Sequence, residues 1–264
     1  MATALAVVLP GDDVTDKITS SHKNIKLGIG LRTVPDTKKI YATCAGSLEQ
    51  RKNTYYIQQS IRRYRPSLED RVIGIVEERI GSDGAGGDIH RVNIGGPHPA
   101  MLSSLSFEGA TKRNKPHLKR GMLLYCRILA TPPLSDPTLS CQLGPHDGGL
   151  VRKDWMTNEG TYGELQNGTC TKIPLGLARE LLNPKSVVLL ELAKQSVKFE
   201  IATGVNGFVW IHSSHPEYTI MIQNAILNSQ VMTEPQIRAM VKTLVQQVNK
   251  QIVDDDDGDE KMED

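Results

Sequence analysis

The hydrophobic pattern of this 264-residue chain changes character after residue 149. Before that point, short runs of β-branched residues alternate with turns rich in glycine and proline, which is typical of β barrels and sandwiches. After it, apolar residues also recur at helical spacing. At roughly 100 to 200 residues per domain, the length allows two or three domains. The pattern predicts a multi-domain chain, mainly β and then α+β.

The first predicted domain is an N-terminal β domain over residues 1–66. Strands are expected at residues 6–9, 39–44 and 53–58. Pro10 and Gly11 follow the first strand, where proline fixes φ and glycine can adopt a positive φ. Gly11 is therefore predicted to be a structural turn glycine, in which any added Cβ would strain the backbone if φ is positive.

Residues 67–148 are predicted to form an OB-fold barrel. Alternating strands are expected at residues 72–78, 89–94, 123–129 and 138–143, with loops of uneven length. The glycine-rich turn at residues 81–87 lacks the Gly-Lys-Ser/Thr ending of a nucleotide phosphate loop and precedes a strand rather than a helix. It is therefore interpreted as a hairpin tip.

Residues 149–253 are predicted to form an α+β domain. Helices are expected at residues 176–182, 185–195, 218–230 and 235–253, and strands at residues 197–203 and 208–212. Thr233, with Gln236 three residues later, has the spacing of a helix N-cap. No internal repeat is present in the sequence.

Charge is distributed unevenly along the chain. Residues 254–264 hold eight acids and one lysine, net −7, whereas residues 1–253 hold 30 basic and 22 acidic residues, net +8. The acidic segment is predicted to be a disordered tail. It either solubilises the protein or screens the basic body from non-specific RNA. A basic body is compatible with a polyanionic partner.

Several classes of function find no support in the sequence. No apolar run approaches the ~20 residues needed to span a bilayer, and residues 1–10 lack the basic start of a signal peptide, so an intracellular protein is expected. The four cysteines lack zinc-site spacing, and His212 and His215 lack partners in register, so neither a metal nor another cofactor is expected. Asp12, Asp13 and Asp16 are interpreted as turn formers, and no catalytic residue is predicted.

The strongest functional signal is a basic loop of the predicted barrel. Between Met101 and Arg127 six basic residues accompany one acid, giving +5. OB-folds track RNA phosphates with basic grooves and stack bases on aromatic side chains, but the nearest aromatics here are Phe107 and Tyr125. Backbone contact with RNA is favoured, and a protein interface or a solvated loop stays open. The predicted RNA-binding residues are Lys112, Arg113, Lys115, Lys119 and Arg120.

Five segments together resemble the Rrp40-type cap subunits of the eukaryotic RNA exosome. They are residues 9–12 (LPGD), 72–76 (VIGIV), 93–96 (NIGG), 105–114 (LSFEGATKRN) and 199–211 (FEIATGVNGFVWI). The segments occur in the family's order, and the match extends over about residues 5–250. The resemblance implies an N-terminal β domain, a central OB-fold RNA-binding domain and a C-terminal KH domain.

The resemblance also implies a role without catalysis. Such a subunit sits on a ring of RNase-PH-like subunits beside other cap subunits and helps admit single-stranded RNA to a 3′-to-5′ exoribonuclease. No membrane or small-molecule substrate is implied. The expected location is the nucleus and nucleolus, and also the cytoplasm. The alternative is a purely structural clamp of the complex that makes no RNA contact.

The sequence departs from a working KH module at one point. KH domains grip RNA with a Gly-x-x-Gly loop between two helices, but residues 183–186 between the expected helices are Asn-Pro-Lys-Ser. The domain is therefore predicted to be mainly structural. Gly204, Asn206 and Gly207 are predicted to form a tight turn in which Gly and Asn accept positive φ, and Trp210 is expected to be a packing anchor or interdomain contact.

Overall fold

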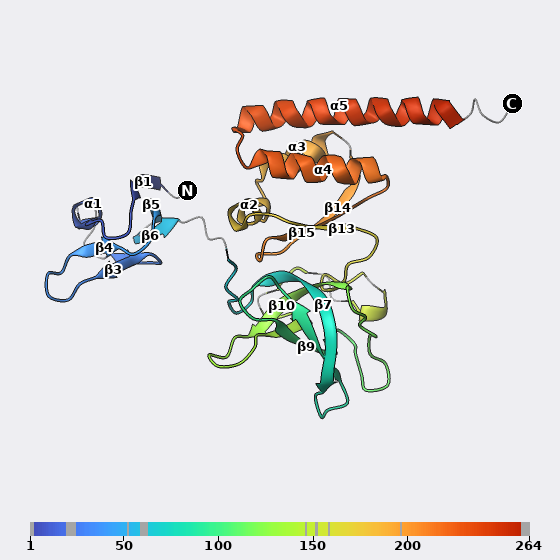
Figure 1. Cartoon of the computed structure of the whole chain (residues 1–264), viewed down its shortest axis with the longest axis horizontal. Helices are drawn as coiled ribbons and strands as arrows, with labels where there is room; N and C mark the ends of the chain where they lie inside the picture. The colour runs from blue at the N-terminus through green and yellow to red at the C-terminus, as the bar shows by residue number, and fades with distance from the viewer. Residues whose placement is uncertain are drawn as a thin grey trace. The chain divides into compact units, whose positions relative to one another are not determined.

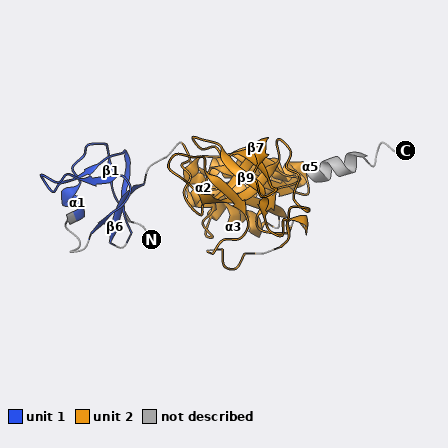
Figure 2. Ribbon diagram, turned by 90° about the horizontal axis from the view of Figure 1, so that it is seen from below, with its two compact units in different colours: residues 1–61 blue, residues 62–264 orange. Residues whose placement is uncertain are grey.

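The computed structural model describes residues 3–19, 25–51, 53–58, 63–145, 147–150, 153–157, 159–195 and 197–259, and the side chains of residues 3, 4, 19 and 251–259 are not described. The chain divides into two compact units, residues 1–61 and 62–264 (Figure 2). The sequence pattern predicts the first domain boundary at residue 66. Within the described part of the chain, no helix is both long and apolar enough to cross a membrane.

The first unit is a small β domain. Its strands are β1 (Thr3–Val8), β2 (Lys26–Leu27), β3 (Leu31–Thr33), β4 (Ile40–Ala42), β5 (Gly46–Arg51) and β6 (Thr54–Gln58). One sheet has the order β1-β5-β6-β2, and β3 pairs with β4. Leu48 and Tyr55 are fully buried in its core, together with Val14 and Ile18. This core fixes the sheet and the turn that contains Gly11.

The turn after β1 is more ordered than the sequence suggested. Asp12 accepts a 2.8 Å hydrogen bond from the backbone N–H of Leu9, and Asp13 accepts one of 3.0 Å from the N–H of Thr15. These bonds agree with the predicted role of Asp12 and Asp13 as turn formers. That prediction is wrong for Asp16, which lies in the helix α1 (Thr15–Thr19) that the sequence analysis missed. An acid in the first turn of a helix is stabilised by the helix dipole.

The second unit begins with the predicted barrel, shown in the lower part of Figure 1. Its strands are β7 (Arg71–Ser82), β8 (Asp88–Asn93), β9 (Ala100–Phe107), β10 (Leu123–Ala130) and β11 (Thr138–Cys141), with β12 (Gly163–Glu164) beside β10. Antiparallel pairing of β10 with β11 and parallel pairing of β11 with β9 close the barrel. The sequence analysis did not identify β9. The confirmed OB-fold places the β9–β10 loop, the predicted RNA loop, outside the closed core.

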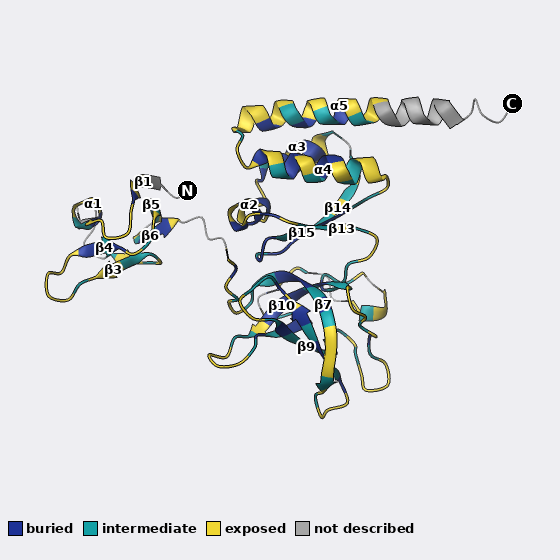
Figure 3. Ribbon diagram, viewed as in Figure 1, coloured by how far each residue is buried: buried dark blue, intermediate teal, exposed yellow. Residues whose placement is uncertain are grey.

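The KH-type domain follows the barrel. Its elements are β13 (Thr169–Lys172), α2 (Leu175–Leu181), α3 (Val187–Lys194), β14 (Phe199–Thr203), β15 (Phe208–Ser213), α4 (Pro216–Ser229) and α5 (Glu234–Asp259). The sheet has the order β13-β15-β14. In Figure 1, α3 and α4 lie between this sheet and α5, and Figure 3 shows that their facing surfaces are buried. The predicted α+β domain is therefore present.

Helix α5 begins as predicted. Thr233 Oγ1 lies 2.9 Å from Gln236 Oε1, and the Thr233 carbonyl accepts the first helical hydrogen bond, from Ile237, at 2.9 Å. The backbone of α5 continues into the acidic segment for which the sequence predicts disorder. The remainder of that segment, residues 260–264, lies outside the described residues.

The turn between β14 and β15 joins the two domains of the second unit. Asn206 is buried there, and its side-chain amide bonds to the backbone of β7 and to Ile94, just beyond β8. The expectation that Asn206 adopts a positive φ is wrong, since in this turn only Gly207, at +81°, does so. A Cβ on Gly204 would lie 2.8 Å from the Ile73 nitrogen, so glycine is needed there for close approach.

Candidate nucleic-acid interface

The five predicted RNA-binding residues all lie on the loop between β9 and β10. Four of them, Lys112, Arg113, Lys119 and Arg120, are exposed and form no ion pair with a described residue. The stem of Lys112 crosses the tip of the β7–β8 hairpin, where a Cβ on Gly86 would lie 3.2 Å from Lys112 Cγ. Four cationic groups are therefore free to meet an anion in solvent.

Lys115, the fifth predicted residue, is engaged within the domain. Its ammonium lies 2.9 Å from Asp88 Oδ2 and donates a 2.8 Å hydrogen bond to the Gly86 carbonyl. The hydrogen bond from Lys115 is the main reason that the pKa of Asp88 is lowered. Lys115 thus fastens the basic loop to the β7–β8 hairpin through Asp88, which also pairs with Arg79 at 2.6 Å.

The tip of the β7–β8 hairpin is closed on itself. Asp83 accepts backbone hydrogen bonds from Ala85 at 2.9 Å and Gly87 at 2.8 Å, and Ser103 donates to it at 2.6 Å. The hydrogen bond from Ser103 is the main cause of the lowered pKa of Asp83. Since an internal carboxylate uses these N–H groups, the glycine-rich turn is the predicted hairpin tip and not a phosphate cradle.

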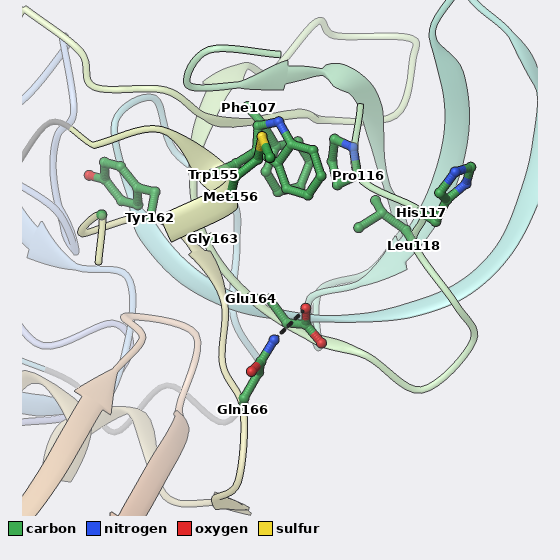
Figure 4. A pocket seen from close by; sticks show the side chains of 11 residues that line it. Phe107, Pro116, His117, Leu118, Trp155, Met156, Tyr162, Gly163, Glu164 and Gln166 are labelled. Atoms are coloured by element: carbon green, nitrogen blue, oxygen red, sulfur yellow. Dashed lines mark hydrogen bonds between the residues drawn. The ribbon is translucent and has the colours of Figure 1, made fainter. Parts of the chain in front are cut away.

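Aromatic side chains near the loop come partly from a segment that the sequence analysis did not consider. The short 3-10 helix η1 (Trp155–Thr157) is held by a 3.1 Å hydrogen bond from the backbone N–H of Trp155 to the backbone carbonyl of Glu108. The indole and the ring of Phe107, at the end of β9, line the same cavity, and both are drawn in Figure 4. Tyr125 instead stacks on Tyr162, with ring centroids 5.6 Å apart. Sequence spacing could not reveal Trp155, because β10 and β11 lie between it and the basic loop.

Phe107, Trp155 and Tyr162 line a cavity of about 180 Å³. Its walls are Phe107 from β9, the segment 116–118 of the basic loop, Trp155 and Met156 from η1, and the segment 160–166 around β12. Asn114 of the basic loop donates a 3.0 Å hydrogen bond to the Met156 sulfur. The basic loop and the cavity therefore form one continuous surface of the barrel.

None of the residues predicted to be structural lines this cavity. Gly11, in the first unit, has a φ of +95°, and Gly204, Asn206 and Gly207 lie in the β14–β15 turn. Trp210 is 5 % exposed in β15, and its ring stacks on His212 at a centroid distance of 6.0 Å. A Cβ on Gly168 would lie 2.2 Å from the Trp210 indole nitrogen. Trp210 therefore packs within the KH sheet.

The turn between α2 and α3 has no glycine in residues 182–186. Asn183 closes it by accepting a 3.1 Å hydrogen bond from the Lys185 N–H and, through its carbonyl, a 2.9 Å bond from the Ser186 N–H. A KH module clamps the RNA backbone with glycines at this position. Among the described residues there is also no group of three potential metal ligands.

Two family models match the second unit. A model described as exosome complex component RRP40, S1 domain, matches residues 64–147, and a KH-domain model matches residues 168–217. The S1 match contains the barrel, the basic loop and Phe107. The KH match contains α2, α3 and the complete three-stranded sheet.

Curated relatives match along most of the chain. An rrp40-type protein of Dictyostelium discoideum, named as an exosome complex component, is 37 % identical, with 89 % of this chain and 90 % of that protein covered. Exosome complex component rrp40 of Schizosaccharomyces pombe is 32 % identical, with 92 % of this chain and 96 % of that protein covered. Human exosome complex component RRP40 is 31 % identical, with 86 % of this chain and 78 % of that protein covered. A crystal structure described as an exosome complex RNA-binding protein superposes with a TM-score of 0.51 at 19 % sequence identity. The match covers 71 % of this chain and 98 % of that chain, and it supports the fold.

Proposed function

The chain belongs to the RRP40 family of exosome complex components, and we propose that it is a non-catalytic, RNA-binding cap subunit of the RNA exosome. In this role it stabilises the ring and guides single-stranded RNA into the 3′-to-5′ exoribonuclease during RNA processing and degradation. Its partners are RNase-PH-like ring subunits and other cap subunits. Its proposed location is the nucleus and nucleolus, and also the cytoplasm.

The observation that carries RNA contact is the set of four exposed cations on the β9–β10 loop: Lys112, Arg113, Lys119 and Arg120. None forms an ion pair with a described residue, so each can neutralise a phosphate without first breaking an internal ion pair. Such contacts are sequence-independent and release counterions from the nucleic acid. This suits a subunit that guides RNAs of many sequences.

The second candidate function is a purely structural clamp. Two observations favour it: Lys115 is used to fasten its own loop, and the α2–α3 turn lacks the glycines of an RNA clamp. In this case the free cations of the loop would meet acidic groups of a neighbouring subunit.

The salt dependence of RNA binding by the full chain separates the two functions. Four phosphate contacts on a single strand predict a log–log slope near −2.8, so fourfold more salt weakens binding roughly fifty-fold. A variant with Lys112→Gln, Arg113→Gln, Lys119→Gln and Arg120→Gln should lose most of that slope and still join the complex. If the variant binds RNA like the original chain but fails to assemble, the structural clamp is correct.

A matched control neutralises four exposed cations of the KH domain: Lys185, Lys198, Lys242 and Lys250. The total charge change is the same in both variants. The proposal expects the control to keep the salt slope of the original chain. An equal loss of slope in both variants would show that binding follows net charge rather than the loop.

A further inference from the structure

The cavity beside the basic loop, which we call the Trp155 cavity, has no role in the phosphate contacts proposed above. Its volume of about 180 Å³ is below the 300 Å³ or more that is typical of drug-sized ligand sites. One ring system is the largest ligand suited to that volume. Phe107, Trp155 and Pro116 supply flat or rigid apolar walls (Figure 4).

The cavity also presents polar groups that can recognise a ligand. Glu164 and Gln166 line the cavity and are joined by a 3.0 Å hydrogen bond, drawn dashed in Figure 4. A carboxylate can accept further hydrogen bonds and an amide can both donate and accept them, so these two side chains can meet the polar edge of a ligand.

The surroundings of the cavity favour RNA over an apolar protein side chain. Pro116 and His117 belong to the basic loop, which also carries the four free cations. A strand whose phosphates lie on those cations would bring its bases to the edge of the cavity. Unstacked RNA bases are commonly bound by stacking on aromatic rings and by hydrogen bonds to their edges.

We propose that the Trp155 cavity accepts one unstacked base of a single-stranded RNA whose phosphates lie on the basic loop. This inference rests on the proposed RNA-binding function and adds a base-binding site to it. Glu164 accepts hydrogen bonds, so it favours a base with an exocyclic amino group. Uracil has carbonyl oxygens in place of such a group, and is disfavoured next to a carboxylate.

The test compares binding of short oligo(A), oligo(C) and oligo(U) to the full chain and to Trp155→Leu, Trp155→Phe and Glu164→Gln variants. Stacking of one base predicts that Trp155→Leu weakens oligo(A) binding roughly five- to a hundredfold. Because a stacked base releases no counterions, the salt slope should not change. Trp155→Phe should retain most of the affinity, and Glu164→Gln should reduce the preference for oligo(A) and oligo(C) over oligo(U).

The outcomes distinguish this inference from the proposed function. Unchanged oligo(A) affinity in Trp155→Leu, with weakened binding in the four-cation variant, would overturn the base site and leave phosphate contact standing. Assembly lost in Trp155→Leu with RNA affinity unchanged would identify the cavity as a protein-docking site, which also overturns the inference. An original chain that binds none of the three oligonucleotides would contradict both proposals. Circular dichroism and thermal unfolding confirm that each variant is folded.

Discussion

The side-chain amide of Asn206 makes a two-way hydrogen-bonded contact with the backbone of Ile73, a residue 133 positions earlier in the chain. Asn206 Nδ2 donates to the Ile73 carbonyl at 2.7 Å, and Asn206 Oδ1 accepts from the Ile73 N–H at 3.3 Å. Nδ2 also donates to the Ile94 carbonyl at 2.9 Å. One KH side chain thus takes the place of a strand partner for the barrel and fixes the S1 and KH domains relative to each other.

Replacement of Asn206 by alanine should weaken the junction between the two domains. The change leaves buried backbone groups of Ile73 and Ile94 without partners, which costs about 1–3 kcal/mol of unfolding free energy. Urea denaturation measures the loss, and faster amide exchange at Ile73 would locate it. Asn224→Ala, an exposed asparagine of α4, is the control. Equal stability of the two variants would show that the junction does not depend on Asn206.

Replacement of Gly11 by alanine should strain the first unit. Gly11 has a φ of +95°, and its N–H bonds to the Ala42 carbonyl at 2.8 Å. A Cβ would meet no atom within 4 Å, so the cost is one of backbone conformation, about 1–2 kcal/mol. Faster amide exchange in the surrounding strands measures it, in residues 3–58 for Gly11 and in residues 71–93 for the control. Gly81→Ala has the same open space without a positive φ and should be better tolerated. Similar effects at both positions would contradict the assignment to φ.

Replacement of Lys115 by glutamine should affect the loop and not the salt dependence of RNA binding. Asp88 and the Gly86 carbonyl hold the Lys115 ammonium, so it is not free to meet a phosphate and the salt slope should stay near that of the original chain. Arg113→Gln should reduce the magnitude of the slope by about 0.7. Amide exchange in residues 109–122 should rise, because the contact with Gly86 is lost. A slope reduced as much by Lys115→Gln as by Arg113→Gln would place Lys115 on the RNA.

The stability of the barrel should fall as the pH drops below neutral, partly because of His90. Burial disfavours the charged imidazole and lowers the pKa of His90 below its ordinary value of 6.5. Below pH 6.5 the unfolded chain therefore takes up a proton that the folded chain does not, so unfolding becomes more favourable. His90→Gln should flatten the fall in unfolding free energy between neutral pH and about pH 5. The control is His98→Gln, since His98 is exposed. An unchanged pH dependence of the unfolding free energy in His90→Gln would rule out this contribution.

Local patterns predicted most of the architecture. Alternation of apolar residues located β7 and β10, and the Thr233–Gln236 spacing located the start of α5. Helix α1, with five residues, could not be recognised from the sequence, because Pro10, Gly11 and the nearby acids are typical of turns. Strand β13 was also not recognised, because it has only four residues and none of them is buried. Short elements carry too few residues for periodicity to identify them.

The contacts between distant segments could not be predicted. Asn206 was expected to adopt a positive φ, but instead its side chain forms hydrogen bonds with strand β7 of the other domain. Lys115 was expected to face RNA, and only the folded barrel brings Asp88 to it. Trp155 was not considered because η1 follows two strands and a long connection. Each of these roles depends on tertiary pairing, which one sequence does not specify locally.

The most direct test of the central claim is affinity purification of the tagged chain and of its four-cation loop variant from native cells, with quantitative mass spectrometry and recovery of ultraviolet-crosslinked RNA. Both proteins should copurify stoichiometrically with RNase-PH-like subunits, and RNA crosslinks to the variant should be strongly reduced. Recovery of the original chain as a lone monomer would contradict the cap role. Equal RNA crosslinks to both proteins in an intact complex would contradict RNA contact through the β9–β10 loop.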